Sequence, residues 1–99
     1  MVIIADEVYQ QNVHTTKEFV SFKKAVRCIE PPYNQAELIS FNSISKGFTG
    51  ECGVRGGYME FVNLDPEVLA QIDKTRDVCS VNVAGSIAVR KSGMKGSWR

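Results

Sequence analysis

The sequence predicts an α/β fold, and three observations carry that prediction. The apolar run Val2–Ala5 precedes an amphipathic segment over residues 19–29, which indicates a strand followed by a helix. Two further apolar segments, Glu37–Phe41 and Tyr58–Val62, flank a glycine-rich loop over residues 42–57. A further helical pattern then follows, and strands that alternate with helices are typical of α/β proteins.

The size and charge of the chain limit what it can be. Its 99 residues allow one small domain of marginal stability, and 43% apolar residues is an ordinary share for a globular protein. A formal charge of +1 gives no long-range field to attract nucleic acid or a membrane surface, so we expect neither as a partner. The apolar N-terminal run is too short to span a membrane.

The cysteines and the histidine indicate that the chain holds no metal. The three cysteines include no pair spaced for zinc, and the chain has one histidine, His14. Three widely separated cysteines fit a reduced intracellular compartment. We expect the cytoplasm, with the mitochondrion as the alternative.

The first strand is expected to lie in the centre of a parallel sheet. Val2–Ala5 is a continuous apolar run, as in strands covered on both faces, and it stops at Asp6 and Glu7. An apolar strand that ends in an acid also occurs in P-loop ATPases, where the acid acts on magnesium. That alternative requires a phosphate loop that ends in Gly-Lys-Ser or Gly-Lys-Thr, and the sequence has none.

The first helix is expected to begin near Thr15 or Thr16, which can act as N-caps, and to end before Pro31. Its buried side is marked by apolar residues at helical spacing, namely Phe19, Phe22, Val26 and Ile29. The loop over residues 42–57 holds five of the eight glycines, which indicates close backbone approach.

The second helix is expected to begin at Asp65-Pro66, an N-cap followed by a favoured first helical residue. Its expected buried residues are Val68, Leu69, Ile72 and Thr75. A further helix is expected over Asn82–Val89, and from Arg90 onward the apolar period is lost.

Six chemically useful side chains fall in a fixed order along the chain. They are an acid, a phenol, two hydroxyls, an amine and a guanidinium. They belong to Asp6, Tyr9, Ser43, Ser45, Lys46 and Arg55. Taken alone, each is more often a surface or packing residue. Their joint order suits pyridoxal phosphate, whose aldehyde, ring nitrogen, ring oxygen and phosphate need such partners.

Each side chain can be matched to one part of that cofactor. Lys46 would bond the aldehyde, and Asp6 would face the ring nitrogen from a strand end, where α/β proteins bind ligands. Tyr9 would bond the ring oxygen. Glu7 should point away from the site, because adjacent carboxylates repel one another. The phosphate partners would be Ser43, Ser45 and Arg55.

Three segments carry a resemblance to a known family, namely Ile4–Gln10, Ser40–Gly47 and Gly50–Glu60. They resemble the class I pyridoxal-phosphate-dependent aminotransferases. The third segment, together with Asp65–Val68, is especially similar to the alanine aminotransferase branch of that family.

The resemblance implies a fold and a domain division. Residues 1–89 would be part of the cofactor-binding large domain of a type-I pyridoxal-phosphate-dependent transferase, a piece of mixed sheet with about three strands and two to three helices. Residues 90–99 would be a disordered tail outside the family.

The resemblance also implies an activity. Lys46 would be the Schiff-base lysine and would also move the substrate proton, with Ser45 a weaker phosphate ligand than Ser43 and Arg55. The family moves the amino group of alanine to 2-oxoglutarate, so the small-molecule substrates would be an amino acid and a 2-oxo acid. Its members are homodimers.

Three outcomes are expected for the chain itself. The first is a transaminase fragment that is inactive alone, because the family's other cofactor-binding and substrate-binding residues are missing. The alternative is a non-catalytic interaction fragment that docks on an intact aminotransferase subunit. The third is an unfolded remnant without a function.

Overall fold

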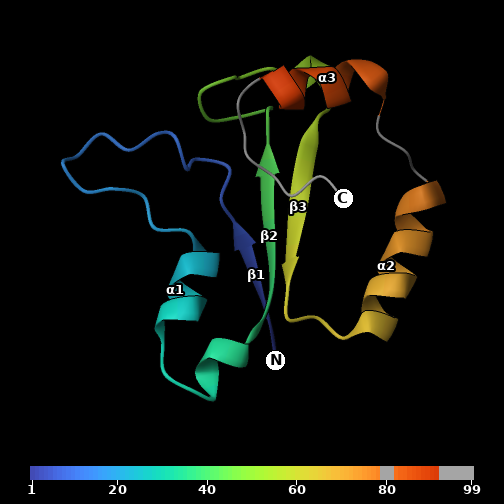
Figure 1. The fold of residues 1–99 in the computed structure, drawn as a ribbon. Coiled ribbons are helices and arrows are strands. Elements are labelled where there is room, and N and C mark those ends of the chain that lie inside the picture. Colours follow the sequence, from blue (N-terminus) through green and yellow to red (C-terminus); the bar gives the residue numbers. More distant parts are fainter. Residues whose placement is uncertain (79–81, 92–99) are drawn as a thin grey trace.

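The computed structural model describes residues 1–78 and 82–91, and within them the chain forms a three-stranded sheet (Figure 1). The strands are β1 (Val2–Asp6), β2 (Glu37–Ser43) and β3 (Gly57–Val62), in the order β1-β2-β3. β1 runs parallel to β2, whereas β3 is antiparallel to it, so the sheet is mixed. The predicted α/β class is confirmed.

Three α-helices accompany the sheet in the described part of the chain: α1 (Phe22–Cys28), α2 (Pro66–Val78) and α3 (Val83–Lys91). Short 3-10 turns, η1 (Tyr33–Gln35) and η2 (Cys52–Val54), lie in the connections. Figure 1 shows α1 beside the sheet, α3 across the end where β2 stops and β3 starts, and α2 outside β3. None of the helices in these residues is long and apolar enough to cross a membrane.

The larger core lies between α1 and one face of the sheet. It consists of Ala5, Val26, Leu38 and Val62, each at most 5% exposed. Along β2, Leu38, Ser40 and Asn42 are all buried, because alternate residues of a strand point to the same face. This face, the covered face, therefore holds polar as well as apolar side chains.

A smaller core holds α3 against the connection between β2 and β3. Its buried residues are Ile44 and Val89, which are 0% and 1% exposed. The two backbones meet at glycines: a Cβ added to Gly56 would lie 2.8 Å from the carbonyl oxygen of Gly85. A methyl group would not fit at that distance, so the two glycines allow α3 to pack directly on the connection.

The expectation that the first strand is central and covered on both faces is wrong in this structure. β2 is central and β1 lies at the edge of the sheet. Ala5 is buried under α1, but Ile4 is 68% exposed on the other side. Side chains of this apolar run point to both faces of the sheet. Within the described residues, other elements cover one of these two faces. The opposite side, here called the open face, exposes Val2, Ile4, Phe41 and Met59.

The first helix is shorter and less buried than predicted. It begins at Phe22, because the hydroxyl of Ser21 caps it by accepting a hydrogen bond from the amide of Lys24 at 3.2 Å. The predicted caps Thr15 and Thr16 lie outside the helix. Of the four residues predicted to be buried, Val26 is buried, and those at least 42% exposed are Phe19, Phe22 and Ile29.

The second helix begins where predicted, because the Asp65 carboxylate accepts a hydrogen bond from the amide of Glu67 at 2.7 Å. The expected buried side is wrong. The helix lies outside the sheet edge rather than over a core, so Val68 and Thr75 are exposed, and Leu69 and Ile72 are half-buried.

The remaining boundaries differ by one or two residues. The helix predicted over Asn82–Val89 is confirmed, and α3 also includes Arg90 and Lys91, while residues 92–99 lie outside the described residues. Asn42 and Ser43, predicted as loop, belong to β2, so the connection to β3 spans residues 44–56.

Candidate functional site

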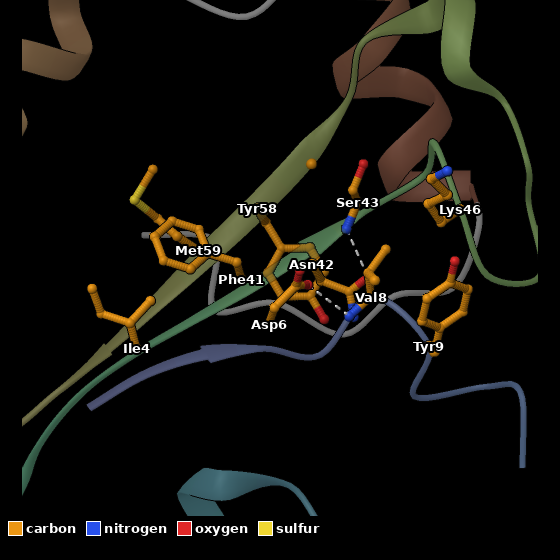
Figure 2. A pocket seen from close by; sticks show the side chains of 11 residues that line it. Ile4, Asp6, Val8, Tyr9, Phe41, Asn42, Ser43, Lys46, Tyr58 and Met59 are labelled. Carbon is orange, nitrogen blue, oxygen red and sulfur yellow. Dashed lines mark hydrogen bonds between the residues drawn. The ribbon is translucent and has the colours of Figure 1, made fainter.

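A groove of about 750 Å³ opens where β1 and β2 end, on the open face of the sheet (Figure 2). The predicted site residues that line it are Asp6, Tyr9, Ser43 and Lys46. The other lining residues are mainly apolar: Ile4, Val8, Phe41, Asn42, Gly57, Tyr58 and Met59. Apolar walls with a few polar groups are the usual form of a small-molecule site.

Asp6 and Glu7 point to opposite sides of the sheet. Asp6 lines the groove, and its Oδ1 accepts a hydrogen bond from the amide of Val8 at 3.3 Å. Glu7 Oε1 instead accepts a hydrogen bond from the amide of Phe22 at 2.7 Å, at the start of α1. Successive side chains alternate at a strand end, so the predicted orientation of Glu7 is confirmed.

Lys46 lies at the same end of the groove as Tyr9 (Figure 2). The next residue, Gly47, has a φ of +62°, and a Cβ there would lie 2.7 Å from the carbonyl oxygen of Val8. Glycine therefore lets the lysine loop pack against the turn that carries Tyr9. A hydrogen bond of 3.3 Å from the amide of Gly50 to the carbonyl of Lys46 closes the loop.

The hydrogen bonds of the Ser43 hydroxyl and of Ser45 lie within residues 43–56. Ser43 Oγ donates to the carbonyl of Gly56 at 3.3 Å and accepts from the amide of Ser45 at 3.0 Å. Ser45 is not among the residues that line the groove, and its carbonyl accepts a hydrogen bond from the Cys52 thiol at 3.0 Å. Ser43 thus lines the groove, but its hydroxyl is already hydrogen-bonded within the connection.

Arg55 is exposed and is not among the residues that line the groove. Its Nη1 donates to the carbonyl of Cys52 at 3.1 Å. Its backbone is left-handed, with a φ of 54°, which costs a non-glycine residue about 1–2 kcal/mol. The candidate site therefore has a groove part, made of Asp6, Tyr9 and Lys46, and a connection part, made of Ser43, Ser45 and Arg55.

Charge in the groove is not neutralised by ion pairs within the described residues. The two ion pairs found there, Lys23–Glu60 and Asp73–Arg76, do not involve any groove-lining side chain. Histidine, cysteine and acidic side chains form no group of three that could hold a metal ion in the same part of the chain.

Sequence reasoning missed Asn42, which is 6% exposed and borders both the groove and a second pocket on the covered face. Its burial continues the alternation along β2 from Leu38 through Ser40, which the structure shows and the residue types do not. The sequence predicts a loop from residue 42 onward, so it gives no position for Asn42 on the strand. The apolar groove walls at Phe41 and Met59 were predicted as strand residues but not as part of a site.

Comparisons with known proteins give a consistent result. No family model matches the chain. A probable mitochondrial alanine aminotransferase of Dictyostelium discoideum is 47% identical over 92 residues, which are 90% of this chain and 17% of that protein. Alanine aminotransferase 1 of Bos taurus is 55% identical over 78 residues, which are 77% of this chain and 16% of that protein.

Glutamate–glyoxylate aminotransferase 1 of Arabidopsis thaliana is 42% identical over 90 residues, which are 88% of this chain and 19% of that protein. The chain thus spans between 16% and 19% of the length of these curated relatives. Over most of its own length, the chain is similar to alanine aminotransferases, and its small α/β structure is consistent with a piece of an aminotransferase domain.

Proposed function

We propose that the chain carries part of the pyridoxal phosphate site of an alanine aminotransferase-like enzyme. The groove part supports this most, because it brings a carboxylate, a phenol and an amine to one groove from two separate segments of the chain. The names of the relatives support transamination as the reaction class.

The groove part would hold the ring and the aldehyde of the cofactor. The amine of Lys46 would hold the aldehyde carbon covalently, with the aldehyde oxygen leaving as water. The carboxylate of Asp6 would stabilise a protonated ring nitrogen, and the hydroxyl of Tyr9 would bond the ring oxygen. When bound, the cofactor supplies an electron sink that weakens the bonds at the α-carbon of the substrate. Lys46 would also move the proton at that carbon.

The groove fits such a cofactor in size and in donor set. Its volume of about 750 Å³ lies in the range of small-molecule sites, and none of its polar side chains is held in an ion pair within the described residues. The connection part fits the phosphate less directly. Ser43 and Arg55 would have to exchange their present acceptors, the carbonyls of Gly56 and Cys52, for phosphate oxygens.

The left-handed backbone of Arg55 supports a specific use of its guanidinium. Glycine would adopt this conformation without strain, and strained residues are concentrated at functional sites. An arginine at this position fits phosphate binding, because its planar fork matches phosphate oxygens. Ser45, whose hydroxyl does not line the groove, is the weaker ligand of the proposal.

Alanine and 2-oxoglutarate are the proposed substrates of the whole enzyme, which we propose to be a homodimer. Glutamate and glyoxylate, in the name of the Arabidopsis relative, are the alternative pair. The proposed compartment is the cytoplasm. The mitochondrion is the alternative, because the Dictyostelium relative is named as mitochondrial.

The chain alone is proposed to be inactive. Transamination needs reacting groups that are held in place and shielded from water. In this structure Tyr9 is 58% exposed and the neighbouring wall residue Ile4 is 68% exposed. Lys46 is exposed as well, so water would reach the reacting groups.

The open face supports the alternative function, docking on an intact aminotransferase subunit. Its exposed apolar side chains would be shielded from water on docking. Titrating the chain into an intact alanine aminotransferase should then reduce the activity of that enzyme in proportion to the complex formed. Full activity at a large excess of chain would rule this function out.

The proposed cofactor site is tested by borohydride reduction of the chain with pyridoxal phosphate, followed by mass-spectrometric mapping of the labelled lysines. We expect Lys46 to take most of the label and Lys46→Ala to lose it. The matched control is Lys74→Ala, which removes an exposed lysine of α2 far from the groove in sequence and should leave the labelling of Lys46 unchanged. Label spread evenly over the exposed lysines would contradict the proposal.

A further inference from the structure

Asn42 occupies a buried position between the ends of two strands. Its side chain is 6% exposed, and it pairs with Tyr58 across the β2–β3 ladder. Its Nδ2 donates to the carbonyl of Glu7 at 3.1 Å, and its Oδ1 accepts from the amide of Ser43 at 2.8 Å. One partner is an acceptor and the other a donor, so both ends of the amide are used.

The bond to the Glu7 carbonyl joins the two segments that carry the groove part, whereas the bond from the Ser43 amide lies within β2. Glu7 directly follows Asp6, and Ser43 is the last residue of β2 before the loop of Lys46. The final backbone bond between the two segments runs from the amide of Glu7 to the carbonyl of Phe41 at 2.9 Å. Beyond it, the side-chain amide of Asn42 adds a further hydrogen bond between the two segments, to the carbonyl of Glu7. Figure 2 shows Asn42 between Asp6 and Ser43.

We propose that Asn42 is a positioning residue that holds the Asp6 carboxylate in register with the Lys46 amine, an inference that rests on the proposed function. Its amide donates across to the end of β1 and accepts from the next residue of its own strand. No apolar side chain can replace these bonds. When Asn42 is removed, the part-buried Ser43 amide loses this acceptor, and the Glu7 carbonyl keeps its bond from the Gln10 amide but loses this bond to β2. Small shifts in the relative position of reacting groups have large effects on reactivity.

Ser40 provides a matched control on the same strand face. It lies two residues before Asn42 and is 5% exposed, and its Oγ has no hydrogen-bond partner within the described residues. Ser40→Ala therefore changes a buried polar residue of β2 without breaking a link between the strand ends. Val26→Ala is a second control, since it weakens the core under α1 away from the groove.

The first readout is made without cofactor. Asn42→Ala should speed hydrogen exchange of the Glu7 and Ser43 amides about tenfold or more relative to Ser40→Ala. The Ser43 amide loses its acceptor, and the end of β1, where the Glu7 amide bonds the Phe41 carbonyl, loses a bond to β2. Asn42→Asp keeps an acceptor for Ser43 but loses the donor to Glu7, so it should speed exchange mainly at Glu7. Unchanged exchange at both amides in Asn42→Ala would overturn the proposal, whatever the cofactor does.

The second readout uses the chain with pyridoxal phosphate. Asn42→Ala should lower the preference of the label for Lys46 by about tenfold or more and should move the pH at which the bound cofactor changes its absorbance. Ser40→Ala and Val26→Ala should change neither. If Asn42→Ala matches these controls, the positioning role is wrong. If the unaltered chain shows no preference for Lys46, the proposed function is wrong instead, and the exchange readout still decides the role of Asn42.

Discussion

The two parts of the candidate site are held in different ways. The groove part, Asp6, Tyr9 and Lys46, comes from the end of β1 and from the loop after β2, and its side chains face an open groove. The side chains of Ser43 and Arg55 in the connection part instead form hydrogen bonds to nearby backbone carbonyls. In that part Ser43 bonds the Gly56 carbonyl and Arg55 bonds the Cys52 carbonyl.

The difference shows what a short segment can do for itself. Polar groups that are close in sequence form hydrogen bonds with one another, as the Ser45 amide does by donating to the Ser43 hydroxyl. Groups from distant segments meet only through the sheet, so they stay available. We therefore expect ring binding to need little rearrangement and phosphate binding to break existing hydrogen bonds.

The largest expected effect comes from moving the two segments of the groove part apart. Gly47→Ala puts a Cβ 2.7 Å from the Val8 carbonyl oxygen at a φ of +62°. We expect it to lower the free energy of unfolding by about 2–5 kcal/mol, from backbone strain plus overpacking. Urea unfolding measures this decrease, and borohydride labelling of Lys46 should fall with it.

Gly50→Ala is the matched control. Gly50 has a φ of +64° but faces open space, so its substitution adds backbone strain alone, about 1–2 kcal/mol. Equal decreases for the two variants would show that packing against the Val8 turn does not hold the lysine loop in place.

The next largest effect concerns Arg55. If Arg55 binds the phosphate as proposed, Arg55→Gly should weaken binding of pyridoxal phosphate about 10- to 100-fold, because it removes a charged hydrogen-bonding partner. The free energy of unfolding should stay level or rise by up to about 1 kcal/mol, because glycine relieves the left-handed strain at a φ of 54°. Cofactor titration and urea unfolding measure the two quantities.

Arg55→Lys separates the two effects, because it keeps the charge and the strain but loses the planar fork. Unchanged cofactor affinity in Arg55→Gly would remove Arg55 from the site.

A smaller effect distinguishes the two serines. Ser43→Ala removes bonds to the Gly56 carbonyl and the Ser45 amide, so it should cost about 1 kcal/mol of stability. Ser45→Ala should stay within about 0.5 kcal/mol, because the bonds that Ser45 makes in the described residues use its backbone. Thermal unfolding of both variants checks this, and equal decreases would mean that the Ser45 hydroxyl has a structural role.

The smallest effect is expected on the open face. Ile4 is 68% exposed in the groove wall, so Ile4→Thr should change the free energy of unfolding by less than about 0.5 kcal/mol. The same change should reduce self-association in sedimentation, because it removes apolar surface. A large decrease in stability would show that this wall is packed in solution. Ala5→Thr, on the covered face of the same strand, should destabilise the chain clearly.

The strands and helix starts were predictable where the signal is local. Asp65-Pro66 begins α2 as expected, because capping depends on neighbouring residues. The buried sides of α1 and α2 were not predictable. Apolar spacing at Phe19 or Val68 marks a side suited to burial, whereas actual burial depends on which element lies opposite.

The candidate site was partly predictable for the same reason. The residue types in order named Asp6, Tyr9, Ser43 and Lys46, which line one groove. Nothing in the order of residues indicated that Arg55 would bond the Cys52 carbonyl, or that Asn42 would lie between strand ends. Both depend on backbone geometry, namely a left-handed residue in one case and two extra residues of β2 in the other.

The mixed sheet has a consequence for the order of folding. β2 and β3 form a hairpin closed by residues 44–56, whereas β1 reaches β2 only after a crossover over residues 7–36. Shorter loops close at a lower entropic cost, so we expect the hairpin to form early and β1 to join late. Lys46 and Arg55 would then be in place before Asp6 reaches the site. When the chain begins to unfold, β1 would detach from β2 first, so the site would fail at Asp6 before the lysine loop comes apart.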